Sequence, residues 1–277
     1  MLYSRMVGGL GNQLFQTAAL LKYRRPKEKV IISFLGEIHV PKRVNCLKTV
    51  FEVPDWIFFD NSRKLNLLTK LFARSSAGLR FGSYLPLIGI NDRNFNYHKS
   101  NFLSQKFLFL DGYFNQYWNY RELYSLFRKL KLKPIILNNY KQKLCNQNVV
   151  IHIRGGDFLS IKKFDICKLN FYKKSIEYAQ SKGLNTFVVI SEDKRYGKEV
   201  IKELKKCLPD LQISIMKSDS IKNDFNIIRS AKFAILSNST FSWWASFLSN
   251  SKKEFLVPSN FSSKEKRILL PKETIIN

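Results

Sequence analysis

From Asn148 onward the chain alternates short β-branched runs with amphipathic segments, and this alternation constrains the fold more than any other feature. Five runs have the length and composition of buried strands, at 149–153, 186–190, 212–216, 233–236 and 254–257. The segments between most of them have helical spacing, at about 170–182, 195–206, 224–231 and 240–248. Strands that alternate with helices predict a parallel, doubly wound α/β sheet.

The N-terminal part begins in the same way, with strands expected at 2–7 and 29–34 and a helix between them at 12–25. The stretch 41–97 is aromatic and irregular, and its pattern does not order its elements. We therefore expect a second α/β sheet in this half, without an assignment of its middle strands.

The length and composition allow two modest domains, since 277 residues with 45% apolar content can bury two cores. Residues 133–147 contain Pro134 and several Asn and Gln side chains, which is typical of a linker. The sequence therefore predicts one domain at 1–140 and a second at 148–277.

A glycine-rich run, Gly8-Gly9-Leu10-Gly11-Asn12, lies between the first expected strand and the first expected helix. Glycines at such a junction permit positive φ and let helix N-terminal N–H groups approach an anion such as a pyrophosphate. A tight turn without a ligand is the alternative. The run lacks the third glycine of a dinucleotide fingerprint and the Lys-Ser or Lys-Thr of a P-loop, which disfavours a dehydrogenase or a P-loop kinase.

Polar or turn-forming residues follow four of the five C-terminal strands, at 152–157, 191–193, 237–240 and Pro258. Ligands of an open parallel sheet bind outside the carboxyl ends of its strands, so these positions predict one anion-binding crevice. Arg154 offers a planar fork of donors that suits a phosphate. Ser191 and Asp193, at the second strand end, are expected to bind the same anionic ligand.

Several of these side chains also have a purely structural interpretation. His152 is either a hydrogen-bonded core histidine or a site residue, and Asp157 either pairs with Arg154 or caps a turn. Ser239 and Thr240 either cap the next helix or hold phosphate oxygens together with its N–H groups, and the two roles are compatible.

The chain is strongly basic, with 47 Lys and Arg against 21 Asp and Glu and a formal charge of +26. Such a field attracts nucleic acid, anionic lipid or phosphorylated substrates. A compositional bias toward lysine is the alternative, because the lysines are scattered. No nucleic-acid module motif is present, so a non-enzymatic nucleic-acid-binding protein is the less favoured function.

Metal and membrane signals are weak in this sequence. It has three histidines without H-E-x-x-H and no Asp-x-Asp pair, so no metal site is expected. Its four cysteines are widely spaced and are expected to be reduced thiols. No run reaches the ~18–20 apolar residues of a membrane span, and the N-terminus has no basic and apolar leader, so we expect a cytoplasmic protein.

Three blocks resemble the signatures of the α-1,2-fucosyltransferases of glycosyltransferase family 11: GGLGNQLFQ at 8–16, HIRGGDF at 152–158 and SNSTFSWWASFL at 237–248. DGYFNQ at 111–116 resembles a weaker block of the family, and 27–106 carries little similarity. The resemblance implies a GT-B fold, in which two Rossmann-like domains face each other across a cleft. It also implies a GDP-fucose donor, a galactoside acceptor, inversion at the fucose anomeric carbon and no metal or other cofactor.

The resemblance further implies roles for individual residues. Arg154 is expected to hold the donor pyrophosphate, His152 to face the guanine end of the nucleotide, and Asp224 to accept from the base. Asp157 is a candidate general base. The remaining implied donor-binding residues are Ser239 and Thr240 on the phosphate and, on the other side of the cleft, Gly9, Gly11 and Asn12.

One position departs from the family pattern, since many members have a second arginine where this chain has Gly155. Either a lysine elsewhere supplies that charge, or backbone donors hold more of the pyrophosphate. The resemblance also implies that the domain at 1–140 lies on the acceptor side and that the domain at 148–277 binds the GDP-sugar donor. We expect an enzyme of surface-polysaccharide synthesis, such as O-antigen or capsule. A GT-B transferase with another GDP-sugar or linkage is the alternative. A lipid-linked acceptor would bring weak peripheral contact with the inner face of an anionic membrane.

Overall fold

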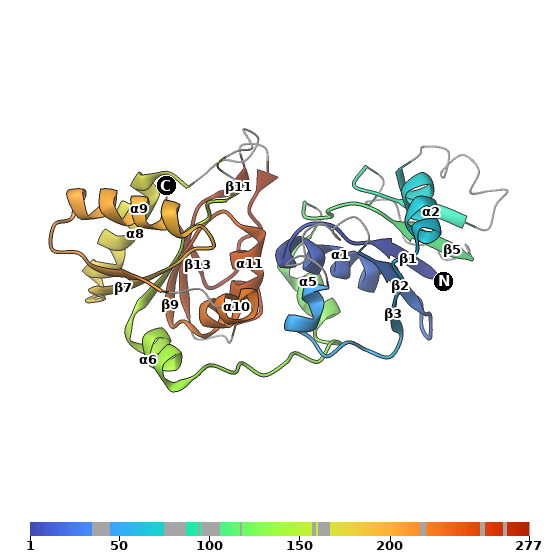
Figure 1. The fold of residues 1–277 in the computed structure, drawn as a ribbon, viewed down its shortest axis with the longest axis horizontal. Helices are drawn as coiled ribbons and strands as arrows, with labels where there is room; N and C mark the ends of the chain where they lie inside the picture. Colours follow the sequence, from blue (N-terminus) through green and yellow to red (C-terminus); the bar gives the residue numbers. More distant parts are fainter. Residues whose placement is uncertain are drawn as a thin grey trace. The chain divides into compact units, whose positions relative to one another are not determined.

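The chain forms two α/β units, Met1–Lys133 and Pro134–Asn277 (Figure 1). The computed structural model describes residues 1–34, 45–74, 87–93, 95, 106–116, 118–156, 159, 167–216, 220–249, 253–262 and 265–276. In this part of the chain, no helix combines the length and apolar character that a membrane crossing requires.

The first unit is built on a parallel sheet with the strand order β3-β2-β1-β5-β4. Its strands are β1 (Leu2–Arg5), β2 (Val30–Ser33), β3 (Ile57–Phe59), β4 (Leu87–Ile90) and β5 (Phe107–Leu110). Its helices are α1 (Leu10–Tyr23), α2 (Arg63–Arg74), α5 (Tyr120–Phe127) and the 3-10 helix η3 (Cys46–Thr49). The β1-α1-β2 and β3-α2-β4 connections run in opposite directions across the sheet, and α1 and α2 accordingly lie on opposite faces (Figure 1).

The second unit has a parallel sheet with the strand order β13-β10-β9-β6-β7-β8. Its strands are β6 (Val149–His152), β7 (Thr186–Ile190), β8 (Gln212–Ile215), β9 (Phe233–Leu236), β10 (Glu254–Val257) and β13 (Glu273–Ile275). The chain passes from β6 outward through β7 to β8, then crosses back to β9 and continues outward through β10 to β13. The order therefore reverses between β6 and β9, which is the topological switch point where such sheets bind ligands.

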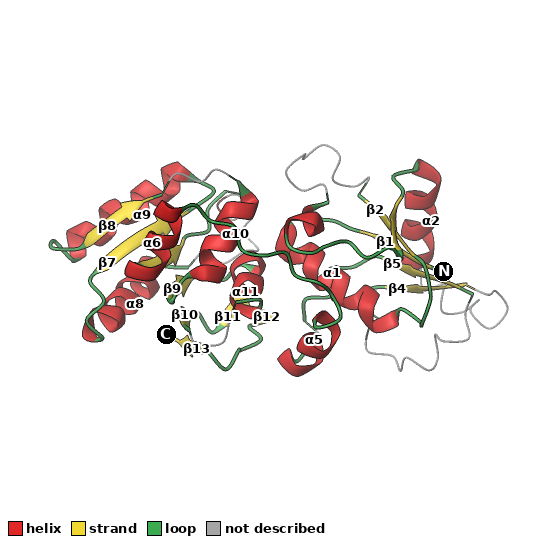
Figure 2. Ribbon diagram, turned by 90° about the horizontal axis from the view of Figure 1, so that it is seen from below, coloured by secondary structure: helices red, strands yellow, loops and turns green. Residues whose placement is uncertain are grey.

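Helices cover both faces of the second sheet (Figure 2). They are α6 (Asn139–Gln147), α8 (Leu169–Ser181), α9 (Lys194–Cys207), α10 (Ile221–Ser230) and α11 (Thr240–Phe247). The strands carry runs of Val, Ile and Phe because the sheet is buried on both faces, and β6 and β9 are buried throughout. The predicted parallel strands and helices of this half are confirmed with shifts of up to three residues at their ends.

Two segments differ from the expectation. The predicted linker 133–147 is helical in its second half, because Asn138 caps α6 by accepting from the Lys141 N–H and because Cys145 is buried. The C-terminal segment adds β13 and the antiparallel pair β11 (Asn260–Ser262) and β12 (Glu265–Lys266), which the pattern did not predict.

Candidate active site

The carboxyl ends of β6 and β9 are joined by a side-chain hydrogen bond at the switch point. His152 Nδ1 and Ser237 Oγ lie 2.8 Å apart, and both side chains are buried. Burial, and secondarily the charge of Arg154, lower the pKa of His152 to about 3. The imidazole is therefore neutral at physiological pH and bridges the two strand ends without carrying charge.

Arg154 lies two residues beyond the bridge and pairs with a carboxylate from the neighbouring strand end. Its Nη1 is 2.9 Å from Glu192 Oε1, and the Gly155 N–H donates to the same oxygen at 3.3 Å. The Arg154 side chain is 24% exposed, so solvent reaches this position. A cationic fork and a backbone N–H thus converge on one anionic oxygen at the ligand-binding edge of the sheet.

The turn after Arg154 is shaped by glycines and by Asp193. Gly156 has φ +55°, and its N–H donates to Asp193 Oδ2 at 3.3 Å. The other carboxylate oxygen of Asp193 caps α9 by accepting from the Tyr196 N–H at 3.0 Å. These backbone hydrogen bonds, that of Tyr196 first, lower the pKa of Asp193.

Close packing leaves little room for a side chain at Gly155, the position where the sequence analysis noted a departure from the family pattern. A Cβ there would lie 2.9 Å from Asp193 Cβ and 2.9 Å from Tyr196 Cδ1. Ser191 is buried below the same turn, and its hydroxyl donates to the Asp193 carbonyl at 2.9 Å. A second arginine at 155 would require this packing to change.

The segment after β9 is held from several sides. Ser239 caps α11 by accepting from the Phe241 N–H at 3.2 Å, and the Ser242 hydroxyl donates to the carbonyls of Ser237 and Ser239. The Asn238 amide donates to the Phe261 carbonyl at 3.0 Å. The first turn of α11 therefore starts from a fixed loop next to the His152 bridge, with Thr240 half-exposed at its first position.

Asp224 lies in the first turn of α10 and is 8% exposed. The helix that carries it packs against α11 through Phe225 and Phe241, whose ring centroids are 5.3 Å apart. Phe241 also contacts the His152 ring at 5.7 Å. The helix that carries Asp224 thus lies beside the first turn of α11, while Asp157 lies outside the described residues.

The β1–α1 loop of the first unit is fixed by two buried amide side chains. Gln13 Nε2 donates to the Gly8 carbonyl at 3.0 Å. Gln16 accepts from the Val7 N–H at 3.1 Å and donates to the Val7 carbonyl at 3.0 Å. Gly8 has φ +80°, and a Cβ there would lie 2.5 Å from Asn12 Nδ2.

Three donor-binding candidates lie in this same loop region. Gly9 precedes α1 with space around its Cα, Gly11 is buried in the first turn, and Asn12 is partly exposed. Neither Gln13 nor Gln16 was assigned a role from the sequence. The sequence feature that could have revealed them is the presence of two amide side chains in a helix whose residues are mostly apolar and buried.

Two further strand ends of the first unit carry carboxylates bound by protein donors. Arg5 Nε is 3.3 Å from Asp111 Oδ1, and the Asp111 side chain is 1% exposed. Asp92 accepts from the Tyr113 N–H at 3.0 Å and from the Phe114 N–H at 2.7 Å. These contacts hold 111–116, the weaker block of the sequence analysis, against the ends of β4 and β5.

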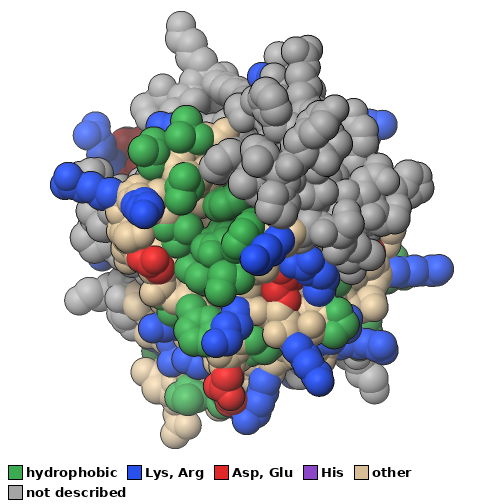
Figure 3. Space-filling model, turned by 90° about the vertical axis from the view of Figure 1, so that its right-hand side faces the viewer, with side chains coloured by type: hydrophobic (Ala, Val, Ile, Leu, Met, Phe, Trp, Pro, Cys, Tyr) green, Lys and Arg blue, Asp and Glu red, His purple; other side chains and the backbone are tan. Residues whose placement is uncertain are grey.

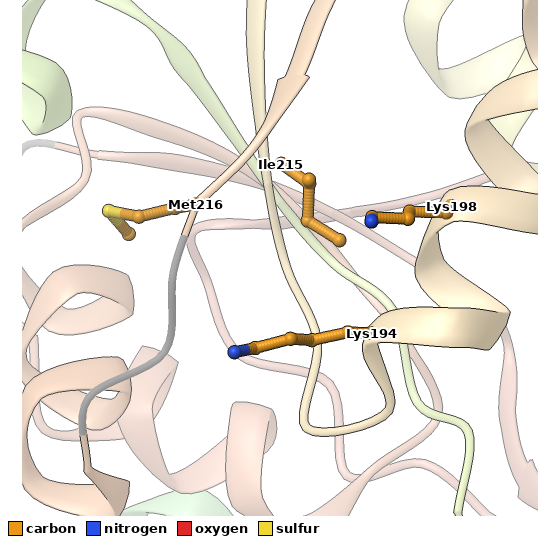
Figure 4. Close-up of a pocket in the computed structure, with 4 residues that line it drawn as sticks. All are labelled: Lys194, Lys198, Ile215 and Met216. Carbon is orange, nitrogen blue, oxygen red and sulfur yellow. The ribbon is translucent and has the colours of Figure 1, made fainter.

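One pocket of the described chain lies apart from this site. A small pocket beside α9 is lined by Lys194, Lys198, Ile215 and Met216 (Figure 4). Both lysines extend from the helix past the end of β8, which is the edge strand on this side and lies two strands from β6.

Among the described residues, no three His, Cys, Asp or Glu side chains are grouped so that they could hold a metal ion.

Comparison with solved structures identifies the type of fold. With 14% sequence identity, the chain superposes on POFUT1 in complex with GDP-fucose with a TM-score of 0.53, over 92% of this chain and 96% of that one. At this identity the likeness concerns the fold alone. Two units with parallel Rossmann-like sheets define a glycosyltransferase fold of the GT-B type.

The family follows from the sequence comparison. The model of glycosyl transferase family 11 matches residues 82–275, and the chain belongs to this family. An Escherichia coli α-1,2-colitosyltransferase is 30% identical over 148 residues, which are 48% of this chain and 50% of that protein. The Escherichia coli O-antigen biosynthesis glycosyltransferase WbnK is 25% identical over 291 aligned positions, covering 92% of this chain and 93% of that protein. The chain therefore aligns with about half the length of the first of these relatives.

Proposed function

We propose that the protein is an inverting α-1,2-fucosyltransferase that moves fucose from GDP-fucose to a galactose-containing glycan. The observation that carries this proposal is the convergence of Arg154 Nη1 and the Gly155 N–H on one anionic oxygen at the switch point. A phosphate oxygen of GDP has the charge and acceptor geometry to take the place of the Glu192 carboxylate. Membership of glycosyl transferase family 11 supports glycosyl transfer as the reaction.

In the proposed reaction the acceptor 2-hydroxyl oxygen forms a bond to the fucose anomeric carbon as the bond from that carbon to the β-phosphate oxygen breaks. GDP leaves with the bonding electron pair, and the acceptor proton passes to a base. Negative charge grows on the β-phosphate, and Arg154 and the N–H groups of α11 are the donors proposed to stabilise it. Asp157 is the proposed base.

The remaining donor-site roles are assigned by position. The neutral His152 and the buried Asp224 are proposed to lie toward the guanine, with Asp224 accepting from the base. Ser239 and Thr240 are proposed phosphate ligands at the start of α11. Gly9, Gly11 and Asn12 are proposed to contact the donor from the first unit, and Ser191 and Asp193 to support the phosphate loop.

We also propose that transfer needs no metal, because Arg154 and helix N–H groups supply the positive charge that a cation supplies elsewhere. Excess EDTA is expected to leave the initial rate unchanged, as measured by GDP release. A loss of activity that Mg²⁺ or Mn²⁺ restores contradicts this part of the proposal.

A second donor is favoured by one comparison, the 30% identity to an α-1,2-colitosyltransferase. Colitose lacks the 3-hydroxyl of fucose, so the two donors test whether the site binds that group. A site that hydrogen-bonds a hydroxyl rejects the analogue lacking it by about 10⁴–10⁵, whereas an apolar site discriminates by only about 10². The kcat/KM ratio of GDP-fucose to GDP-colitose with one galactoside acceptor decides between the two enzymes.

The similarity to WbnK supports O-antigen synthesis as the setting. We propose in addition that the acceptor is carried on lipid at the cytoplasmic face of the membrane. A panel of galactosides tests the acceptor, with product linkage determined by NMR. The nucleic-acid alternative is tested by thermal shift, since a ligand at about 100 times its Kd adds about 2.7 kcal/mol of stability. Stabilisation by an oligonucleotide but not by GDP contradicts the proposed function.

A further inference from the structure

Helix α2 has one buried side and one exposed apolar side. Leu65 is 8% exposed, and Thr69 is fully buried with its hydroxyl donating to the Leu65 carbonyl. This side packs on β1, β4 and β5. On the outer side Leu67 is 56% exposed and Leu71 is 54% exposed, and their spacing of four residues places them on one face.

The exposed leucines are flanked by cations. Arg63, Lys64 and Lys70 are all exposed, and helical geometry places them on either side of the leucine pair. The α2 sequence contains no Asp or Glu. In the described parts of the chain no carboxylate forms a salt bridge with these three cations, and nearby Asp60 accepts from the Ser62 N–H.

The face of the molecule that includes α2 shows the same combination. Hydrophobic side chains gather on its surface and are bordered by Lys and Arg, with few acidic groups among them (Figure 3). Exposed apolar side chains that adjoin one another on a surface are typical of an interaction site. A cationic border adds a preference for a partner that is negatively charged and has an apolar interior.

Helix α9 shows that these features are not shared by every basic helix of this chain. Its apolar residues Val200 and Leu204 are buried against the sheet. Its cations alternate with acids, and two of them form salt bridges, Arg195 with Glu199 and Lys206 with Glu203. Helix α2 differs in both respects, because it presents leucines to solvent and lacks acidic neighbours in its own sequence.

We infer that α2 is a membrane-docking helix that lies on an anionic bilayer. Leu67 and Leu71 enter the boundary between headgroups and acyl chains, while Arg63, Lys64 and Lys70 contact lipid phosphates. Two leucines and three cations give reversible binding that high salt weakens. The inference rests on the proposed function in one respect, since a lipid-linked acceptor would require the enzyme to work at a membrane surface. Membrane docking itself is measured without any substrate.

The test compares matched variants of the whole protein by sedimentation with vesicles. The vesicles contain phosphatidylglycerol and phosphatidylcholine, or phosphatidylcholine alone. The variant Leu67→Gln with Leu71→Gln removes the apolar stripe, and Ile136→Gln, at a position 65% exposed, is its control. The variant Lys64→Gln with Lys70→Gln removes two cations, and Lys202→Gln with Lys205→Gln on α9 is its control.

We expect the wild type to bind the anionic vesicles at low salt and to be released at high salt. The leucine variant and the α2 lysine variant should each bind at least tenfold more weakly, the latter because each near-surface lysine contributes about fivefold. Both controls should bind like the wild type. Transfer to a soluble galactoside should be the same in all variants, which separates failure of docking from failure of the proposed function.

Three outcomes would overturn the inference. The first is failure of the wild type to bind anionic vesicles. The second is a loss of binding in the α9 lysine variant as large as that in the α2 lysine variant. The third is a change of oligomeric state of the leucine variant in analytical ultracentrifugation while its vesicle binding is unchanged. The second outcome would mean that charge acts diffusely. The third would mean that a second copy of the chain covers α2.

Discussion

The loop after β1 in the first unit and the loop after β6 in the second occupy equivalent places, yet their backbone groups are satisfied by opposite chemistry. In the first unit the neutral, fully buried amides of Gln13 and Gln16 reach up from α1 to Gly8 and Val7. In the second unit charged groups from the neighbouring strand end, Glu192 and Asp193, bind the Gly155 and Gly156 N–H groups.

The two loops are therefore expected to differ in how much their contacts contribute to the stability of the fold. Buried amides left without partners cost free energy, so the first loop is fixed by the folding of α1. The Arg154–Glu192 pair is partly exposed to solvent, and such a pair contributes little to stability. In the proposed function a donor phosphate takes the place of the Glu192 carboxylate beside Arg154, and a partly exposed pair of this kind permits that exchange.

The largest expected effect is that of Arg154→Ala on turnover. Loss of a charge donor to the leaving group should lower kcat by about a hundredfold or more, equivalent to about 2.7 kcal/mol. Arg154→Lys should restore little, because a point charge does not reproduce the planar fork. The readout is GDP release under donor saturation, with circular dichroism and urea unfolding to confirm the fold.

Arg195→Ala is the matched control, since Arg195 forms an exposed pair with Glu199 on α9. It should leave both turnover and stability unchanged. Wild-type turnover in Arg154→Ala would reduce Arg154 to a structural ion-pair residue.

The next effect concerns the stability of the first unit. Gln16→Ala removes a fully buried side chain and leaves the partly buried Val7 N–H and carbonyl without their partner, and we expect a loss of about 2 kcal/mol. Gln16→Met restores most of the volume without the hydrogen bonds and should remain destabilised. Urea unfolding measures both, and Gln142→Ala, at an exposed position on α6, is the control. Equal stability of Gln16→Met and wild type would show that packing alone fixes the loop.

The sequence pattern was most informative where the sheet is buried on both faces, as in β6, β7 and β9, because such strands are continuous apolar runs. It also located Arg154 directly after such a run, at the carboxyl end of β6, and its role there stays a prediction. It did not reveal partners set by strand order. The His152–Ser237 bond joins residues 85 positions apart and follows from the reversal between β6 and β9.

Other features were hidden for different physical reasons. Glu192 stands beside the predicted Ser191 and Asp193, but its contact depends on the conformation of the Gly155–Gly156 turn. Gln13 and Gln16 are polar residues that point inward, which a pattern based on apolar periodicity does not distinguish from exposed ones. Strand β3 is three residues long, too short for a clear alternation.

The third effect is a pH dependence that only the second loop should show. The pKa of His152 lies at about 3 in the folded protein, against about 6.5 in an unfolded chain. Between these values the unfolded chain binds a proton that the folded chain does not, so stability is complete above pH 6.5 and falls as the pH drops. The slope approaches about 1.4 kcal/mol per pH unit.

His152→Asn keeps a polar group beside Ser237 and removes the titration. Its unfolding free energy should fall less steeply than that of the wild type between pH 6.5 and pH 5, whatever its stability at pH 7. Parallel curves for the two proteins would mean that His152 takes up a proton in the folded state, and that the bridge to Ser237 carries charge.

The smallest effect tests directly whether the second loop exchanges anions. Glu192→Gln keeps an oxygen that can accept from the Gly155 N–H but removes the negative charge beside Arg154. If the carboxylate occupies the position of a phosphate oxygen, GDP must displace it, and the variant should bind GDP several-fold more tightly. The gain should shrink at high salt, because the pair is partly exposed. Isothermal titration with GDP at two salt concentrations measures it, and Glu199→Gln on α9 is the control. Weaker GDP binding in Glu192→Gln would instead make Glu192 a positioning residue that holds Arg154 in place for the donor, and the second loop would then be as fixed as the first.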